Sequence, residues 1–205
     1  MQNQTPSQTT ALASEDATPI ISLVIPVYNE IEVLPLLFER VRKVMHDINL
    51  SYEMVMVDDG SKDGSADFLI HQAQQDPCVR AVILSRNFGK EAALSAGLEQ
   101  AQGEAMIVLD ADLQNPPELI PEMLEKWRAG ADIVAMKRRD REGESWVKKS
   151  GSYVYYRIMN RITGSMNIPE DTGDFRLMSR RSVDSLNRLP ERNRYMKGLF
   201  AWVGY

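Results

Sequence analysis

Short runs of apolar residues alternate with segments of helical spacing from residue 20 to about residue 137. The expected strands span residues 20–27, 52–57, 79–84, 105–109 and 133–136. Strands that are apolar without interruption are buried on both faces, and helical connections place successive strands parallel to one another. We therefore expect an α/β fold with a mainly parallel central sheet and helices on both of its faces.

The chain is large enough for one hydrophobic core, since 43% of its 205 residues are hydrophobic. The first 18 residues are polar and lack the apolar stretch of a signal peptide, so we expect a disordered tail there. Residues 19–137 are expected to form the α/β core, and residues 138–205 to add a loop and helices to the same domain. No apolar run reaches the roughly 18 residues that a membrane-spanning helix needs.

Polar clusters follow four of the expected strands. They are PVYNE at residues 26–30, DDGS at 58–61, SRN at 85–87 and DAD at 110–112. Ligands of open parallel sheets bind beyond the carboxyl ends of the strands, and all four clusters fall on that edge. The sequence therefore predicts a binding site there.

Asp110 and Asp112 stand two residues apart at the end of an apolar strand, so both can reach one ion while Ala111 turns away. Carboxylates suit Mg²⁺ or Mn²⁺, and Mg²⁺ commonly shares its coordination shell with substrate phosphates. Gln114 follows closely. This pattern indicates a site for a metal and a nucleotide diphosphate, with a solvated turn as the alternative.

Asp58 and Asp59 end a neighbouring strand, where their carboxylates could accept hydrogen bonds from a base or from ribose hydroxyls. The Asp-Gly-Ser sequence is also ordinary turn chemistry, and Ser61 is suited to capping the following helix. The two interpretations are compatible, and both stay open here.

Several other classes of site are disfavoured. The chain has no glycine-rich dinucleotide loop after the first strand, no P-loop, no nucleophile elbow and no zinc-hydrolase motif. One cysteine and two histidines argue against a disulfide framework and against a zinc site.

Six motifs follow one another along the chain. They are IPVYNE at 25–30, VDDGS at 57–61, SRNFGKE at 85–91, DADLQ at 110–114, DTGDFRLM at 171–178 and RYMKGL at 194–199. In this order they resemble family-2 glycosyltransferases. Within that family they look most like the branch of dolichol-phosphate mannose synthase and the bacterial polyprenyl-phosphate (bactoprenol) glucosyltransferases. The resemblance runs from about residue 20 to the end of the chain.

The resemblance implies a GT-A fold, a nucleotide-sugar donor, Mg²⁺ or Mn²⁺, and inversion at the anomeric carbon. By matching motifs, the nucleoside would be held by Pro26, Tyr28, Glu30, Asp58 and Asp59. The metal and diphosphate would lie at Asp110, Ala111, Asp112 and Gln114, with the two aspartates and Gln114 as metal ligands. Arg138, just after the fifth strand, would contact a donor or acceptor phosphate.

Asp174 matches the acceptor-side carboxylate that is described as the base in this branch. A lipid monophosphate has a second pKa of about 6, so it is largely an anionic nucleophile at neutral pH. We therefore expect Asp174 to orient Arg176 or the acceptor, with general-base action secondary. A hydroxyl acceptor would instead need a true base. The alternative for Asp174 is an ion pair with Arg176 or a cap in a Thr-Gly-Asp turn.

The charges are distributed unevenly. Residues 1–136 carry 9 Lys and Arg against 21 Asp and Glu, a net charge of −12, whereas residues 137–205 carry 15 against 8, a net charge of +7. A basic C-terminal third favours an anionic partner such as phosphate, lipid headgroups or nucleic acid, with a solvated basic surface as the alternative. Further phosphate ligands are expected at Arg194 and Lys197 near the C-terminus, and at Arg86 and Lys90 for the donor diphosphate.

Residues 137–149 are polar and basic, and we expect them to form a loop that closes over donor and acceptor. Apolar residues at helical spacing across 155–166, with arginines beside them, indicate an amphipathic helix at a membrane interface. Packing of that helix on the core or on another subunit is the alternative. An exposed helix of this kind would favour self-association.

We therefore expect transfer of a hexose, best glucose from UDP-glucose, to undecaprenyl or another polyprenyl phosphate at the cytoplasmic face of the inner membrane. A UDP-sugar is favoured over a GDP-sugar, and no nucleic-acid partner is expected. Members of this branch carry transmembrane helices after the region that ends here, so we expect a truncated catalytic domain. The alternatives are a soluble glycosyltransferase with a polysaccharide or other hydroxyl acceptor, and a non-catalytic GT-A binding domain. The sugar and the base stay open.

Overall fold

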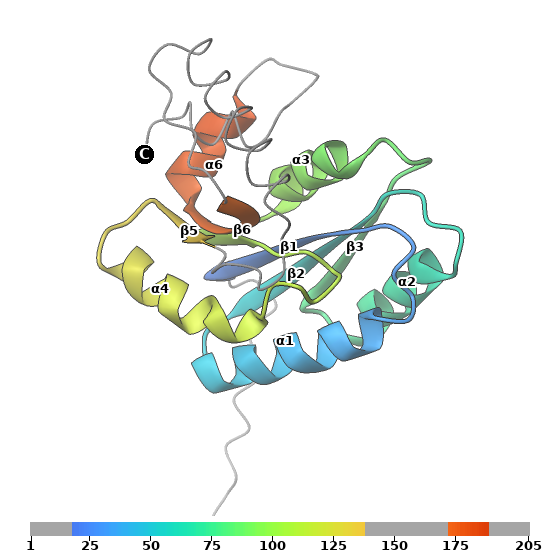
Figure 1. The fold of residues 1–205 in the computed structure, drawn as a ribbon, viewed down its shortest axis with the longest axis horizontal. Coiled ribbons are helices and arrows are strands. Elements are labelled where there is room, and N and C mark those ends of the chain that lie inside the picture. The colour runs from blue at the N-terminus through green and yellow to red at the C-terminus, as the bar shows by residue number, and fades with distance from the viewer. Residues whose placement is uncertain (1–17, 138–171, 189–205) are drawn as a thin grey trace, which may run out of the picture.

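A six-stranded sheet forms the centre of the molecule, in the strand order β3-β2-β1-β4-β6-β5 (Figure 1). The computed structural model describes residues 18–137 and 172–188. The strands are β1 (Ile21–Val27), β2 (Tyr52–Asp58), β3 (Val79–Ile83), β4 (Ala105–Val108), β5 (Ile133–Lys137) and β6 (Thr172–Ser179). Strands β1 to β4 pair in parallel, and β6 pairs antiparallel with both β4 and β5. The prediction of a mainly parallel sheet is confirmed.

Helices cover both faces of this sheet, as predicted. On one face lie α1 (Leu34–Ile48), α2 (Ser65–Gln75) and α4 (Ile120–Arg128), with the short 3₁₀ helix η1 (Pro117–Leu119) before α4; on the other lie α3 (Lys90–Gln100) and α6 (Arg180–Asn187) (Figure 1). The apolar residues accordingly form two buried clusters, one on each side of the sheet.

Strand β1 is apolar along most of its length because its side chains alternate between these two clusters. Leu23 and Ile25 join the cluster under α1, and Val24 joins the cluster under α3. Ser22 is its buried polar exception: its hydroxyl donates to Glu53 Oε1 at 2.6 Å and accepts from the backbone N–H of Gly103 at 2.7 Å. The buried hydroxyl is therefore hydrogen-bonded, as a polar group in a core must be.

Strand β6 is a feature that the sequence did not lead us to expect. It comes from the part of the chain for which we predicted only a loop and helices, yet it lies inside the sheet between β4 and β5. Its register pairs Met178 with Met106 and Arg176 with Val108. The C-terminal part of the chain therefore completes the central sheet.

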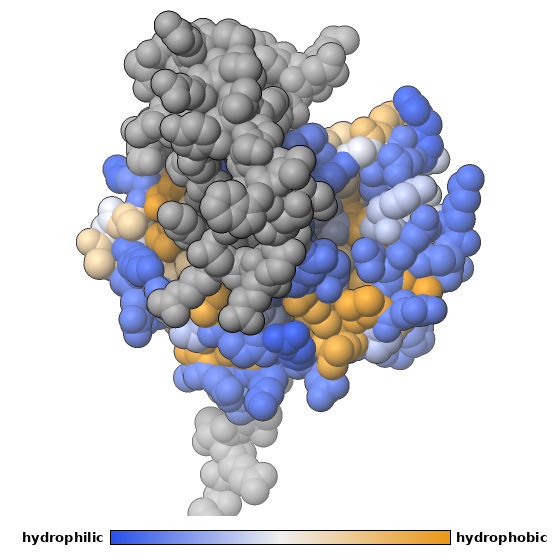
Figure 2. All heavy atoms as spheres, in the orientation of Figure 1, coloured by the Kyte–Doolittle hydropathy of each residue, from blue (hydrophilic) through white to orange (hydrophobic). Residues whose placement is uncertain are grey.

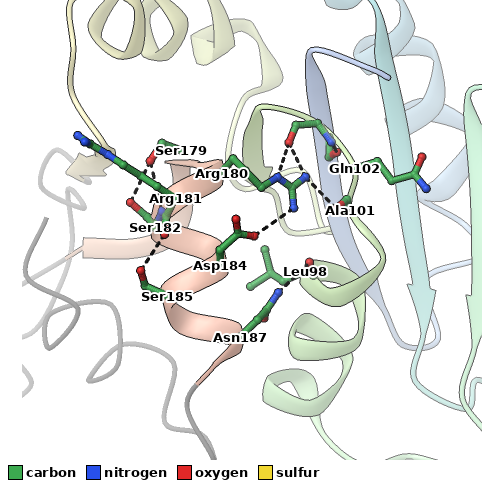
Figure 3. A network of polar contacts seen from close by, with 12 residues as sticks. Leu98, Ala101, Gln102, Ser179, Arg180, Arg181, Ser182, Asp184, Ser185 and Asn187 are labelled. Atoms are coloured by element: carbon green, nitrogen blue, oxygen red, sulfur yellow. Dashed lines mark hydrogen bonds and ion pairs between the residues drawn. The ribbon is translucent and has the colours of Figure 1, made fainter. Parts of the chain in front are cut away.

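A polar network fastens β6 and α6 to the turn between α3 and β4 (Figure 3). Arg180 donates from Nη2 to the Ala101 carbonyl at 2.9 Å and from Nε to the Gly103 carbonyl at 3.0 Å. Ser179 caps α6 by accepting from the Ser182 N–H. Because Ser179 pairs with Ala105, this network lies at the amino end of β4, opposite the edge with the polar clusters.

The described surface is mainly hydrophilic on the face shown in Figure 2, with apolar side chains between the polar ones. The large hydrophobic side chains that are exposed are Tyr28, Leu36, Ile70, Ile83 and Phe88. No helix within residues 18–137 and 172–188 is long and apolar enough to cross a lipid bilayer. The amphipathic helix expected at residues 155–166 and the loop expected at 137–149 lie outside these ranges, apart from the last residue of β5.

Candidate active site

A cleft of about 270 Å³ opens beyond the carboxyl ends of the parallel strands, beside the start of α3. It is lined by Pro26, Val27, Tyr28, Glu30, Asp59, Asn87, Gly89, Lys90, Ala93, Asp110, Ala111 and Asp112. The structure thus brings together the donor-site residues predicted within its described ranges, except Asp58 and Arg86. Gln114 is exposed and does not line the cleft. Arg138, Arg194 and Lys197 lie outside the described ranges.

The loop after β1 is held in place by the loop after β2. The Asn29 N–H donates to Ser61 Oγ at 2.9 Å, and Asn29 Oδ1 accepts from the Lys62 N–H at 2.8 Å. The Glu30 N–H donates to the buried Ser65 hydroxyl at 3.1 Å. Asn29 takes a left-handed backbone conformation (φ 55°), which asparagine tolerates. These contacts fix the backbone that carries Tyr28 and Glu30 into the cleft.

Asp58 supports the turn after β2 instead of facing the cleft. Its side chain is fully buried, and its Oδ2 accepts from the N–H groups of Gly60 and Ser61, both at 3.0 Å. The expected Ser61 cap is wrong, because α2 begins at Ser65 and the Ser61 hydroxyl accepts from Asn29 instead. The turn chemistry of this motif is therefore present in the structure.

Asp59 lines the cleft and fixes the loop that leads into α3. Its two carboxylate oxygens accept from the N–H groups of Phe88, at 2.7 Å, and Gly89, at 2.9 Å. The same loop packs closely on Gly60, where an added Cβ would lie 2.5 Å from the Arg86 carbonyl carbon. The Arg86 guanidinium stacks over the Phe88 ring, 4.2 Å from its centroid. One wall of the cleft is thus anchored to β2.

Asp110 and Asp112 follow β4, and the buried Ala111 lies between them, as expected. Asp112 Oδ1 accepts from the Gln114 N–H at 3.0 Å, and Asp112 itself lines the cleft. Asp110 Oδ2 lies 3.4 Å from the side-chain amide of Asn115. The buried Asn115 side chain thus orients Asp110, while Pro116 occupies the N-cap position of η1 without a side-chain hydrogen bond.

The chemistry of these donors fits a divalent cation that shares its ligands with a substrate. No cluster of three His, Cys, Asp or Glu side chains that could enclose a metal by themselves occurs in the described ranges. Two carboxylates suit Mg²⁺ or Mn²⁺, which take one or two protein carboxylates together with substrate phosphates. Burial raises the pKa of Glu30, and the nearby carboxylates of Asp112 and Asp63 raise it further. A bound cation would offset the repulsion among these carboxylates.

Lys90 supplies the cationic side chain of the cleft. Its Nζ lies 2.6 Å from Asp110 Oδ1 and also 2.6 Å from Asp174 Oδ2. Burial alone would lower the pKa of the Lys90 ammonium, but the pull of Asp110 and Asp174 outweighs it and leaves the pKa above its ordinary value. The sequence suggested Lys90 only as a ligand of the diphosphate. Its contact with Asp174 could not be predicted from a local sequence pattern, because the two residues lie far apart in the chain.

The antiparallel register of β6 explains why Asp174 arrives at this position. Val108 pairs with Arg176, so the same register continued by two residues places Asp174 opposite Asp110. Arg176, two residues along the same strand, is only 5% exposed. Burial lowers its pKa to about 10, although Asp174 and Glu91 act in the opposite direction. The predicted acceptor-side pair, Asp174 and Arg176, thus adjoins the predicted metal side.

Comparison with known sequences gives close relatives. An uncharacterized glycosyltransferase of Synechocystis is 52% identical over 185 residues, which cover 90% of this chain and 58% of the relative. A protein of Shigella phage SfV named bactoprenol glucosyl transferase is 46% identical over 184 residues, which cover 90% of this chain and 60% of the relative. The chain therefore spans less than two thirds of the length of these curated relatives.

Comparison with solved structures supports the fold. Glucosyl-3-phosphoglycerate synthase from Mycobacterium tuberculosis, solved with Mn²⁺, UDP and phosphoglyceric acid, superposes with a TM-score of 0.60 at 19% identity. The match covers 83% of this chain and 59% of that one. At this identity it shows the GT-A fold alone. Residues 22–186 match the profile of the family described as Glycosyl transferase family 2, and the chain belongs to that family.

Proposed function

We propose that this chain is the catalytic part of an enzyme that transfers glucose from UDP-glucose to a polyprenyl phosphate. The observation that carries the proposal is the cleft lined by Asp110, Asp112 and Lys90, whose ammonium contacts both Asp110 and Asp174. The choice of sugar and acceptor is supported by the 46% identity with the phage bactoprenol glucosyl transferase.

The donor would lie in the cleft with its base and ribose near Tyr28 and Asp59, and with its diphosphate near Asp110 and Asp112. These two aspartates would hold Mg²⁺ or Mn²⁺, and the Mn²⁺ and UDP bound to the mycobacterial relative in fold support that assignment. When bound, such a cation offsets the charge that develops on the leaving diphosphate. Asp59 acts indirectly as well, because it holds the loop that leads to Lys90.

The transfer itself needs no proton from the acceptor. A phosphate oxygen of the acceptor forms the new bond to the anomeric carbon, and the bond from that carbon to the diphosphate oxygen breaks, with its electron pair leaving on UDP. A lipid monophosphate at neutral pH is already largely ionised, since its second pKa is about 6. Asp174 is therefore proposed to orient Arg176 or the acceptor, with proton removal as a secondary role.

The acceptor and the membrane would meet the basic C-terminal third, whose net charge of +7 over residues 137–205 contrasts with −12 before it. Arg138, Arg194 and Lys197 are proposed as phosphate ligands there. This charge distribution supports a place for the enzyme at the cytoplasmic membrane face, where anionic headgroups attract basic segments.

A transfer assay tests this proposal. The purified protein is incubated with undecaprenyl phosphate, MnCl₂ or MgCl₂, and a panel of labelled UDP- and GDP-sugars, and the lipid-linked product is extracted. We expect product from UDP-glucose, none in excess chelator, and a loss of at least about a hundredfold in Asp112→Asn. Asp67→Asn on the exposed side of α2 serves as the matched control and should keep full activity. No lipid-linked product with any donor would contradict the proposal.

A further inference from the structure

Lys90 joins two carboxylates that belong to different sides of the reaction. Asp110 stands at the end of β4 on the metal side, and Asp174 lies in β6 on the acceptor side. The ammonium lies 2.6 Å from one oxygen of each, while both carboxylates are largely covered, with side-chain exposures of 18% and 19%. Two neighbouring carboxylates repel each other, so a shared cation is what allows them to lie this close.

The position of Lys90 is set by the loop before it. Lys90 is the first residue of α3, and Gly89 before it has a φ of 95°, a backbone conformation that favours glycine. The N–H groups of Phe88 and Gly89 are both held by the Asp59 carboxylate. Lys90 therefore extends from an anchored point, and its side chain reaches the two carboxylates from a fixed origin.

A divalent cation and the Lys90 ammonium compete for Asp110. The ammonium contacts Asp110 Oδ1, and the Asn115 amide faces Asp110 Oδ2. A divalent cation that binds Asp110 and Asp112 needs one of these two Asp110 oxygens. Its double positive charge would then lie beside the positively charged Lys90 ammonium and repel it. Asp174 is the carboxylate that Lys90 would keep, because Asp174 belongs to β6 and is not one of the two aspartates assigned to the metal.

We propose that Lys90 is a positioning residue that holds Asp174 next to the donor site and gives up Asp110 when the divalent cation binds. The proposal rests on the metal site of the proposed function. It adds that metal loading and the position of the acceptor-side carboxylate are linked through one side chain. A lysine that only stabilised the fold would behave differently, because its removal would loosen the site and weaken metal binding.

The test is a direct measurement of Mn²⁺ binding to the purified 205-residue protein by electron paramagnetic resonance, without nucleotide. Lys90→Met removes the competing charge at similar side-chain length, and Lys90→Arg keeps the charge. Lys126→Met, on the exposed face of α4, is the matched control. We expect Lys90→Met to bind Mn²⁺ at least about fivefold more tightly than the unchanged protein. The other two variants should stay within about twofold of it.

Turnover of the same variants in the transfer assay shows whether Lys90 positions Asp174, separately from its effect on Mn²⁺ binding. Lys90→Met should turn over about tenfold or more slowly at saturating Mn²⁺ and donor, because Asp174 is no longer held. Tighter metal binding together with slower turnover is the result that supports the proposal. An unchanged or weaker Mn²⁺ affinity in Lys90→Met overturns the role of Lys90 and leaves the proposed function standing. Absence of Mn²⁺ binding in every variant overturns both this role and the metal site.

Discussion

The Glu30 carboxylate occupies a position in the cleft that is unfavourable for the stability of the fold and suited to ligand binding. Its carboxylate lies near Asp112 and Asp63, and its backbone is held by Ser65. A side chain that only supported the fold would not be placed among like charges. The unfavourable placement is explained if a cation and a donor with hydroxyl groups occupy the cleft during the reaction.

The raised pKa of Glu30 gives a prediction for stability against pH. Burial, Asp112 and Asp63 raise this pKa, so the native state binds the proton more tightly than the unfolded state does. The associated stability is fully present below the unfolded pKa of about 4.3 and is lost as the pH rises through the native pKa. Glu30→Gln should therefore raise the melting temperature at pH 7 by about 1–2 °C, an effect reduced by solvent screening, and should change little near pH 4.

Thermal melts of Glu30→Gln at the two pH values, in the absence of divalent cations, measure this effect. Glu32→Gln, exposed on the same loop and outside the cleft, is the control and should show no such difference. A lower melting temperature of Glu30→Gln at pH 7 would show that the carboxylate stabilises the fold after all.

At the scale of elements, the wall of the cleft depends on contact between two loops. Gly60 has a φ of 71°, and an added Cβ would meet the backbone of Arg86 at 2.5 Å. Gly64 has a φ of 97° but no atom within 4 Å of such a Cβ. Gly60→Ala should cost about 3 kcal/mol of unfolding free energy and weaken UDP binding, whereas Gly64→Ala should cost about 1 kcal/mol and leave binding unchanged.

Denaturant unfolding and calorimetric titration with UDP check both glycine variants. Equal losses of stability in the two variants would mean that the loop before α3 moves freely to admit the added methyl group. The cleft wall would then not be fixed by this contact.

The side chain of Arg180 attaches strand β6 and helix α6 to the turn between α3 and β4, with Arg181 in a minor role. Arg180→Ala removes the donors that reach the Ala101 and Gly103 carbonyls and should lower the unfolding free energy by about 2 kcal/mol. Arg181, whose side chain is 65% exposed, pairs with Asp132, and Arg181→Ala should cost less than about 1 kcal/mol. A larger loss in Arg181→Ala, measured by denaturant unfolding, would contradict this ranking.

The elements that were predictable from the sequence are those with local signals. Strands β1 to β5 are short apolar runs in the sequence, so they were expected close to their observed bounds, and helical spacing indicated the helices between them. Strand β6 is different, because its pairing with β4 and β5 depends on contacts far apart in the chain. The same holds in the site: Asp110 and Asp112 have a recognisable spacing, whereas the contact of Lys90 with Asp174 exists only once β6 is in the sheet.

From the separation of charge between the two parts of the chain we predict that the basic part binds anionic lipid surfaces. Lys148 and Lys149 lie in the basic part, outside the described ranges. Lys148→Gln with Lys149→Gln should weaken co-sedimentation with anionic liposomes by about tenfold or more, and the difference should shrink at high salt. Lys43→Gln with Lys62→Gln, in the acidic part, is the control. Unchanged liposome binding would favour packing of this region on the protein itself.

We expect the carboxyl edge of the sheet to bind a metal and a nucleotide diphosphate at Asp110 and Asp112. Crystals grown with UDP and MnCl₂, with diffraction measured at the manganese edge, show whether it does. We predict one anomalous peak within bonding distance of the Asp112 carboxylate, beside Asp110 and the diphosphate, with Lys90 still in contact with Asp174. A peak elsewhere, or UDP bound outside the cleft, would contradict the account.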